Sequence, residues 1–134
     1  MTVEKGNGTL SDRVLAAAVK VHKTLGSGFL EKVYENALMV EFRKQGIRAE
    51  QQKAVPVWYE EENVGDYVAD IIVENTLIIE LKAIRAFCDE HTACCMNYLQ
   101  ATNLPVCLLL NFGRRTLQIK RFVGEAYERC AQPI

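Results

Sequence analysis

Two acidic residues and a lysine near the middle of the chain, Asp70, Glu80 and Lys82, have side chains that could act together on a phosphate ester. Carboxylate oxygens are ligands that Mg²⁺ prefers, and such a site leaves room for water and phosphate oxygens. A lysine beside the ion is a compact positive charge that could hold a water molecule or a phosphate. The competing interpretation is structural, an ion pair of Lys82 with Asp70 or Glu80 at the edge of a sheet.

A predicted β-hairpin brings these residues together. Two segments rich in β-branched and apolar residues, 67–73 and 77–81, are separated by only three residues, which is typical of a hairpin. With those three residues as the turn, Asp70 lies directly opposite Glu80, and Lys82 follows on the same face of the sheet. Because the surroundings are apolar, the two carboxylates should repel each other. We therefore expect a raised pKa for one of them or a cation between them.

The rest of the chain is expected to add helices and further strands to this hairpin. The expected elements are a helix capped by Thr9 or Ser11 and broken at Gly26, a helix over 29–45, a strand over 55–59, the hairpin, a helix over 89–102, strands over 105–112 and 116–122, and a short helix over 124–130. This order predicts an α/β (α+β) fold, a mixed β-sheet flanked by helices.

Length and composition limit the choice of protein class. The chain has 134 residues, of which 49% are hydrophobic and 25% charged, so we expect a single globular domain over 1–134 with 1–8 as a flexible tail. The net charge of -1 excludes a strongly basic, histone-like binder. The polar N-terminus, the odd number of cysteines and the short apolar runs predict a cytoplasmic protein with reduced thiols and no membrane partner.

The spacing of the three chemical residues resembles a known signature. Asp70, followed after nine residues by Glu80-Leu81-Lys82, is similar to the D…ExK motif of the PD-(D/E)XK nuclease superfamily. Upstream, Gly28, Glu31 and Tyr34 fit the GxxExxY pattern. That pattern names a small prokaryotic family assigned to this superfamily. The resemblance covers the chain from about residue 10 to residue 123 and includes LGSGFLEKVYENAL, IIELKA, LLLNFG and LQIKRF.

This resemblance implies a restriction-endonuclease-like core with its active site on the central hairpin. It implies that Asp70 and Glu80 bind Mg²⁺, with Mn²⁺ as a substitute, and that the Leu81 carbonyl is a further ligand. Lys82 would position the attacking water, and Glu31 would be an additional acidic group. The implied activity is metal-dependent hydrolysis of DNA phosphodiester bonds, by an endonuclease or an exonuclease.

Three positions depart from the family pattern. Val68 stands where relatives usually carry Arg, Cys94 where they carry Gln, and Gln100 where they carry Arg or Lys. These differences favour an alternative function: a catalytically weak or inactive nuclease-fold module that binds nucleic acid or a protein partner.

Several residues are candidates for contacts with the substrate. The resemblance points to Tyr34 and His91, and the basic cluster that includes Arg114 and Arg115 could contact a nucleic-acid backbone or be a solvated hairpin tip. Trp58 and its neighbour Tyr59 could stack on bases or belong to the core. Because cutting both strands of a duplex favours two sites related by a two-fold axis, we also expect a homodimer.

A thiol-based or zinc-based function is a more remote alternative. Cys88, His91 and Cys95 share one face of the predicted helix at spacings of three and four residues. No fourth zinc ligand lies nearby in the sequence, and buried free thiols are common core residues.

Overall fold

The computed structural model describes residues 8–134, so the expected flexible tail lies outside the described residues except for Gly8. The elements, in chain order, are α1 (Leu10–Leu25), α2 (Glu31–Lys44), β1 (Ala49–Tyr59), β2 (Glu62–Val73), β3 (Leu77–Lys82), α3 (Asp89–Thr102), β4 (Val106–Asn111), β5 (Gln118–Val123) and a short 3₁₀ helix, η1 (Glu125–Arg129). The predicted order of helices and strands is confirmed, and the last helix is 3₁₀.

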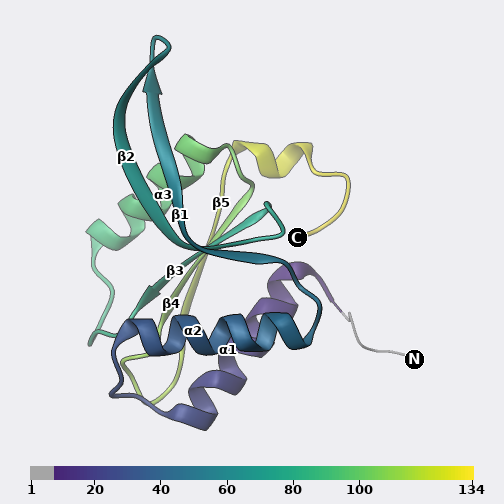
Figure 1. The fold of residues 1–134 in the computed structure, drawn as a ribbon, viewed down its shortest axis with the longest axis vertical. Helices are drawn as coiled ribbons and strands as arrows, with labels where there is room; N and C mark the ends of the chain where they lie inside the picture. The colour runs from purple at the N-terminus through teal and green to yellow at the C-terminus, as the bar shows by residue number, and fades with distance from the viewer. Residues whose placement is uncertain (1–7) are drawn as a thin grey trace.

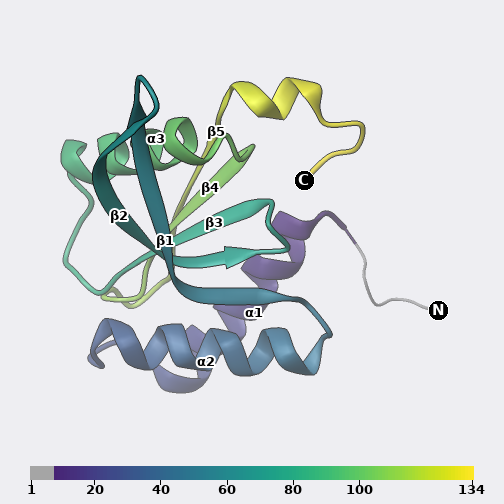
Figure 2. The same ribbon diagram turned by 45° about the horizontal axis from the view of Figure 1, so that its top comes forward.

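The five strands form one mixed sheet in the order β1-β2-β3-β4-β5 (Figure 1). Neighbouring strands are antiparallel except β3 and β4, which are parallel and are connected through α3. Figure 2 shows α1 and α2 on one side of the sheet and α3 on the other. The expected α/β architecture of a mixed sheet flanked by helices is therefore confirmed.

Alternation of side chains along the central strands builds the core on both faces of the sheet. Ile71 and Ile79 pack under α1 and α2, whereas Ile72 and Ile78 pack against α3. Both faces are covered, so β3 and β4 are apolar on each side and are almost entirely buried. Among the described residues, no helix has the length and apolar character needed to cross a membrane.

The ends of α1 follow from local chemistry. Thr9 Oγ1 accepts the backbone N–H of Asp12, and the Asp12 carboxylate accepts the backbone N–H of Thr9. Gly26 ends the helix at φ 73°, a conformation that glycine adopts at little cost. Thr9 is thus the cap, and the alternative cap, Ser11, is buried and bonds the Ile134 carbonyl.

Strands β1 and β2 are longer than predicted and continue past the sheet as a two-stranded arm, the β1–β2 arm (residues 53–69), which projects from the body in Figure 1. The start of β1 was missed because its residues are polar and exposed and show no apolar alternation. At the tip, Glu60 and Glu61 both have positive φ, as a tight two-residue hairpin turn requires. Trp58 and Tyr59 are 62% and 65% exposed, so their assignment to the core is wrong.

Candidate active site

The predicted register of the central hairpin is confirmed where its two strands pair. Val73 pairs with Leu77, and the ladder continues to Ile71 opposite Ile79. It stops there, one residue before Asp70 and Glu80 would meet. The strands separate at the position where the sequence places the two carboxylates.

Side-chain hydrogen bonds take over where the ladder ends. The backbone N–H of Asp70 donates to Glu80 Oε1 at 3.2 Å, and the backbone N–H of Leu81 donates to Asp70 Oδ2 at 2.8 Å. Each carboxylate therefore holds the opposite strand. The second oxygens, Asp70 Oδ1 and Glu80 Oε2, accept no hydrogen bond from residues 8–134.

Both carboxyl groups are shifted toward the protonated form. Glu80 is only 7% exposed, and this burial, reinforced by the charge of Asp70, raises its pKa to about 8. Partial burial is also the main cause of the raised pKa of Asp70, although the Leu81 N–H favours its charged form. The pair thus carries an unfavourable concentration of negative charge when both groups are ionised.

The chain is irregular beside Asp70. Strict alternation would place Ala69 on the same face as Ile71, yet Ala69 packs with Ile72 on the α3 side. On the neighbouring strand β1, Gln52 lies opposite Asp70. Gln52 has φ 50°, a left-handed conformation that interrupts the β1–β2 ladder there. The regular alternation of β2 is therefore interrupted next to Asp70.

Lys82 lies at the end of β3, half-buried, opposite Asn111 of β4. Burial outweighs the charge of Lys82, which lowers the pKa values of Asp70 and Glu80 only weakly. None of the ion pairs among residues 8–134 involves Lys82. The structure therefore does not show the direct ion pair with Asp70 or Glu80 that the structural interpretation requires.

Helix α2 brings two more carboxylates toward the site. Glu31 is exposed in the first turn of α2, and Glu35 is buried one turn later. Both raise the pKa of Asp70 through their negative charge, Glu35 more than Glu31. Glu35 accepts hydrogen bonds from the side-chain amides of Gln51 and Gln52, at 2.6 and 2.9 Å. The sequence analysis missed Glu35, although its position four residues after Glu31 places both on one face of the helix.

Asn111 is a second residue that the sequence analysis missed. It is completely buried, and its side chain bonds both backbone groups of Ile84, two residues after Lys82, at 2.9 Å each. The same side chain also bonds the N–H of Gly113 and the side chain of Gln118. Gly113 packs so closely on Ile84 that a Cβ there would overlap its backbone. Asn111 therefore fixes the chain immediately after Lys82.

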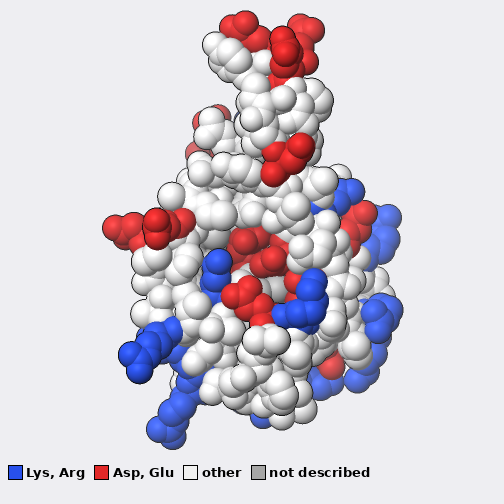
Figure 3. Space-filling view, turned by 60° about the vertical axis from the view of Figure 1, so that its left-hand side comes forward, with Lys and Arg blue, Asp and Glu red and all other residues white. Residues whose placement is uncertain are grey.

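Figure 3 shows this side of the molecule as a hollow beneath the β1–β2 arm. Asp and Glu side chains lie at its floor, and Lys or Arg side chains lie on either side. An acidic floor with basic walls suits a cation bound to a phosphate group.

Tyr34 does not lie where a substrate contact would need it. Its side chain is completely buried and stacks on Phe112, with ring centroids 4.6 Å apart. Its hydroxyl donates to the Gly26 carbonyl and accepts the Phe29 N–H. The expectation of a nucleic-acid contact is therefore corrected: Tyr34 anchors the α1–α2 loop to the core.

His91 and the cysteines do not assemble a zinc site. His91 Nδ1 accepts the backbone N–H of Cys88 at 3.0 Å and so caps the start of α3. Cys95 is buried on the inner face of α3, where the nearby Cys107 thiol is the main cause of its lowered pKa. Among residues 8–134, no group of three or more His, Cys, Asp or Glu side chains is arranged to hold a metal ion. The central hairpin accordingly offers two carboxylates, those of Asp70 and Glu80, as candidate side-chain ligands.

The loop between β4 and β5 carries Arg114 and Arg115, both exposed. Together with Arg85 from the β3–α3 loop, they line an open hollow of about 500 Å³. Because β3 and β4 are parallel and Lys82 pairs with Asn111, this basic hollow lies at the same end of the sheet as Lys82.

The three departures from the family pattern have different surroundings. Val68 is 47% exposed on the arm, and its carbonyl accepts the Tyr98 hydroxyl at 2.8 Å. Cys94 is half-buried near Glu80, and burial is the main cause of its raised pKa. Gln100 is exposed on α3.

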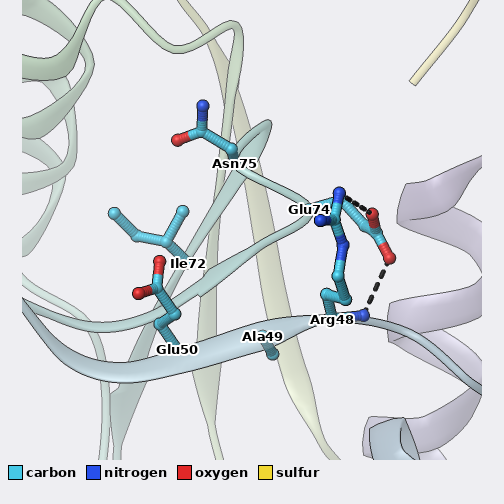
Figure 4. A pocket seen from close by; sticks show the side chains of 6 residues that line it. All are labelled: Arg48, Ala49, Glu50, Ile72, Glu74 and Asn75. Atoms are coloured by element: carbon cyan, nitrogen blue, oxygen red, sulfur yellow. Dashed lines mark hydrogen bonds and ion pairs between the residues drawn. The ribbon is translucent and has the colours of Figure 1, made fainter.

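A separate hollow of about 330 Å³ lies where β1 begins, beside the turn of the central hairpin (Figure 4). Arg48 and Glu74 cross it with two hydrogen bonds, one from the Arg48 backbone at 2.8 Å and one from its guanidinium at 3.4 Å. The Arg48 backbone N–H is the main cause of the lowered pKa of Glu74. None of the predicted site residues lines this hollow, and its Arg48 and Glu74 side chains are already paired with each other.

Comparison with known proteins identifies the family. The family model described as the PD-(D/E)XK nuclease superfamily matches residues 8–122, most of the chain and all of the central hairpin. No curated protein and no solved structure matches the chain. The match is at the level of the superfamily, and the narrower GxxExxY assignment stays a prediction from Gly28, Glu31 and Tyr34. The chain belongs to the PD-(D/E)XK nuclease superfamily.

Proposed function

We propose that this protein is a metal-dependent nuclease that hydrolyses phosphodiester bonds of DNA. The observation that carries the proposal is the Asp70–Glu80 pair: two carboxylates, each fixed by a backbone N–H, and each with a second oxygen that no described residue engages. Members of this superfamily generally use divalent metals for such hydrolysis. The unpaired Lys82 beside the two carboxylates gives further support.

The residues fit a hard divalent cation such as Mg²⁺, or Mn²⁺ in its place. Asp70 Oδ1 and Glu80 Oε2 are oxygen donors whose burial and mutual repulsion a cation would relieve. The Leu81 carbonyl is a further candidate ligand. Its N–H bonds Asp70, and both backbone groups of a strand residue point toward the same neighbouring strand. When bound, the cation would supply positive charge to the phosphate and lower the pKa of a coordinated water.

Lys82 is proposed to hold the attacking water or a non-bridging phosphate oxygen. Its ammonium has three donors, and no described carboxylate pairs with it. Asn111 keeps the following segment in place and so limits where the ammonium can go. Glu31, exposed at the rim, is an additional acid that could accept a proton from water.

The backbone of the substrate is proposed to lie against Arg114 and Arg115. These exposed guanidiniums occupy the same end of the sheet as Lys82 and can bind phosphate in a bidentate manner. His91 stays a candidate contact from the start of α3, whereas Tyr34 is not proposed for this role.

The test is DNA cleavage by the purified protein on circular and on end-labelled linear DNA. Cleavage should require Mg²⁺ or Mn²⁺ and should be lost in Asp70→Asn, Glu80→Gln and Lys82→Ala. The exposed carboxylate variant Glu128→Gln is the matched control and should keep full activity. Only an endonuclease cuts the circle. Cleavage in the presence of a chelator, or full activity of Glu80→Gln, would refute the mechanism.

An inactive nuclease-fold module is the alternative, and Val68 favours it. An exposed apolar side chain stands where relatives usually carry Arg, so a cation is missing two residues from Asp70. DNA binding that survives in Glu80→Gln, with no cleavage by the wild-type protein under any divalent metal, would support this alternative.

A further inference from the structure

An open groove runs between the β1–β2 arm and helix α3. It consists of two adjoining hollows of about 440 and 470 Å³ that share Tyr67 and Asn97. Trp58 and Tyr67 come from the arm, and Asn97, Tyr98 and Gln100 come from α3. We call this feature the arm groove.

Two aromatic side chains of the arm groove, Trp58 and Tyr67, are exposed, and Tyr67 is packed against a neighbour. Trp58 is 62% exposed and Tyr67 44% exposed. Tyr67 packs edge-on against Tyr98, with ring centroids 5.9 Å apart, and the Tyr98 hydroxyl is fixed on the Val68 carbonyl. Exposed aromatic faces are the surfaces on which unpaired bases stack.

The amides of the arm groove are free to bind. Neither Asn97 nor Gln100 makes a side-chain hydrogen bond with residues 8–134, and both line the same hollow. Residues three apart on a helix share a face, so both amides can reach one bound group. An amide offers a donor and an acceptor together, which matches the hydrogen-bonding edge of a base.

The charges around the arm groove favour bases over phosphates. Of the described residues, no Lys or Arg lines either hollow, and the only charged one that does is Glu90. The tip of the arm is acidic (Figure 3), with Glu60, Glu61, Glu62 and Asp66. A duplex would present phosphates along both edges to this acidic arm, whereas a single strand can turn its bases inward and its phosphates to solvent.

The arm groove opens beside the candidate active site. Cys94 and Tyr98 line its inner hollow, and both lie close enough to Glu80 for its charge to raise their pKa values. The Tyr98 hydroxyl bonds the Val68 carbonyl, two residues before Asp70. A strand lying in the arm groove would therefore pass close to the proposed metal ligands.

We propose that the arm groove binds unpaired nucleobases, so that the substrate is single-stranded DNA or a single-stranded segment next to a duplex. The inference rests on the proposed nuclease function and specifies its substrate. Trp58 and Tyr67 stack on the bases, and Asn97 and Gln100 bond their edges.

Trp58 is the one tryptophan of the chain, so its fluorescence reports directly on the arm groove. The wild-type protein in EDTA is titrated with a single-stranded oligonucleotide, the duplex of the same sequence, and an abasic oligonucleotide of the same length. The single strand should quench the fluorescence, and the abasic strand, which keeps every phosphate, should not. Equal quenching by the abasic strand or the duplex, or no response to any of them, would overturn the proposal.

Variants locate the binding with a labelled single-stranded oligonucleotide and fluorescence anisotropy. Trp58→Ala should weaken binding at least about fivefold, and Gln100→Ala should weaken it as well. Tyr59→Ala is the matched control, because Tyr59 is equally exposed but points to the opposite side of β1. Unchanged affinity in Trp58→Ala would overturn the proposal.

Binding in EDTA and cleavage with metal separate this inference from the proposed function. If binding at Trp58 depends on the bases but no DNA is cleaved, the proposed nuclease function is refuted and the proposed role of the arm groove stands. If cleavage requires metal but shows no preference for unpaired bases, the proposed nuclease function stands and the proposed role of the arm groove is refuted.

Discussion

The backbone N–H of Asp70 donates to the Glu80 carboxylate one residue beyond the last pair of the β2–β3 ladder. A backbone pair would have held the strands there without charge. The protein instead uses a buried and a half-buried acidic group, Glu80 and Asp70, which repel each other when ionised. A stability cost is therefore concentrated at the position where the proposed reaction takes place.

Removing one of the two charges should stabilise the metal-free protein. Asp70→Asn retains an oxygen for the Leu81 N–H but eliminates the repulsion with Glu80. Its melting temperature in EDTA should exceed that of the wild type, and Glu128→Gln should leave it unchanged. Wild-type protein should gain about 2.7 kcal/mol when Mg²⁺ is at a hundredfold excess over its Kd, and Asp70→Asn should gain nothing. If Asp70→Asn is instead less stable than the wild type, and the wild type does not respond to Mg²⁺, the two carboxylates have a structural role.

The raised pKa of Glu80 gives the metal-free protein a specific pH dependence. Its pKa is about 8 in the folded chain and 4.5 ordinarily, so the folded state binds the proton more tightly than the unfolded state. The contribution of Glu80 to the free energy of unfolding is therefore fully present below about pH 4.5, and it is lost as the pH rises through 8. Urea unfolding in EDTA should show stability falling by at least about 1 kcal/mol over this interval. Glu80→Gln should flatten the slope, and an identical slope in both proteins would contradict the assignment.

Lys82 should affect the rate of cleavage without affecting folding. Lys82→Ala should lower kcat at least about a hundredfold with little change in melting temperature, because the side chain makes no ion pair among the described residues. Lys82→Arg should not restore the rate, since a planar guanidinium does not replace a compact ammonium. Single-turnover kinetics measure the chemical step. Equal rates for Lys82→Ala and wild type would remove Lys82 from the mechanism.

Asn111 should matter for both stability and activity. Asn111→Ala leaves the backbone groups of the half-buried Ile84 without their partner and should cost about 1–3 kcal/mol in urea unfolding. Cleavage at a temperature where the variant is folded should also fall, because the segment after Lys82 is released. Gln132→Ala, at an exposed position near the C-terminus, is the control. Normal cleavage by folded Asn111→Ala would limit this residue to a structural role.

The homodimer predicted from the sequence depends on a duplex substrate, because cutting both strands favours two sites related by a two-fold axis. Sedimentation at tens of micromolar protein, with and without duplex DNA, measures this directly. A monomer under both conditions would indicate that one chain acts on one strand at a time.

The hairpin and its carboxylates could be predicted because two strong local signals agree. Apolar, β-branched strands flank a three-residue gap, and that gap sets the register as far as Ile71 opposite Ile79, one residue before Asp70 and Glu80. The helices and their order follow from apolar spacing and from breaks such as Gly26.

The features that could not be predicted from the sequence depend on burial by elements that are far apart along the chain. Glu35 and Asn111 look like a surface helix acid and the polar end of a strand, and only the packed sheet shows that both are buried. Tyr34 belongs to the GxxExxY pattern, but its place in that pattern does not reveal that its ring stacks on Phe112. Trp58 follows two apolar strand residues and therefore resembles a core residue. Its strand, however, has already left the sheet at that point.

The projecting arm also bears on aggregation. β1 is an edge strand, and a free edge of this length can recruit a strand from another molecule. Pro56 has no N–H and therefore removes one donor from that edge, in the position where sheets tolerate proline. The acidic tip adds repulsion between arms that approach each other. The protein can thus expose an aromatic surface on a long hairpin while discouraging the edge-to-edge pairing that begins fibril growth.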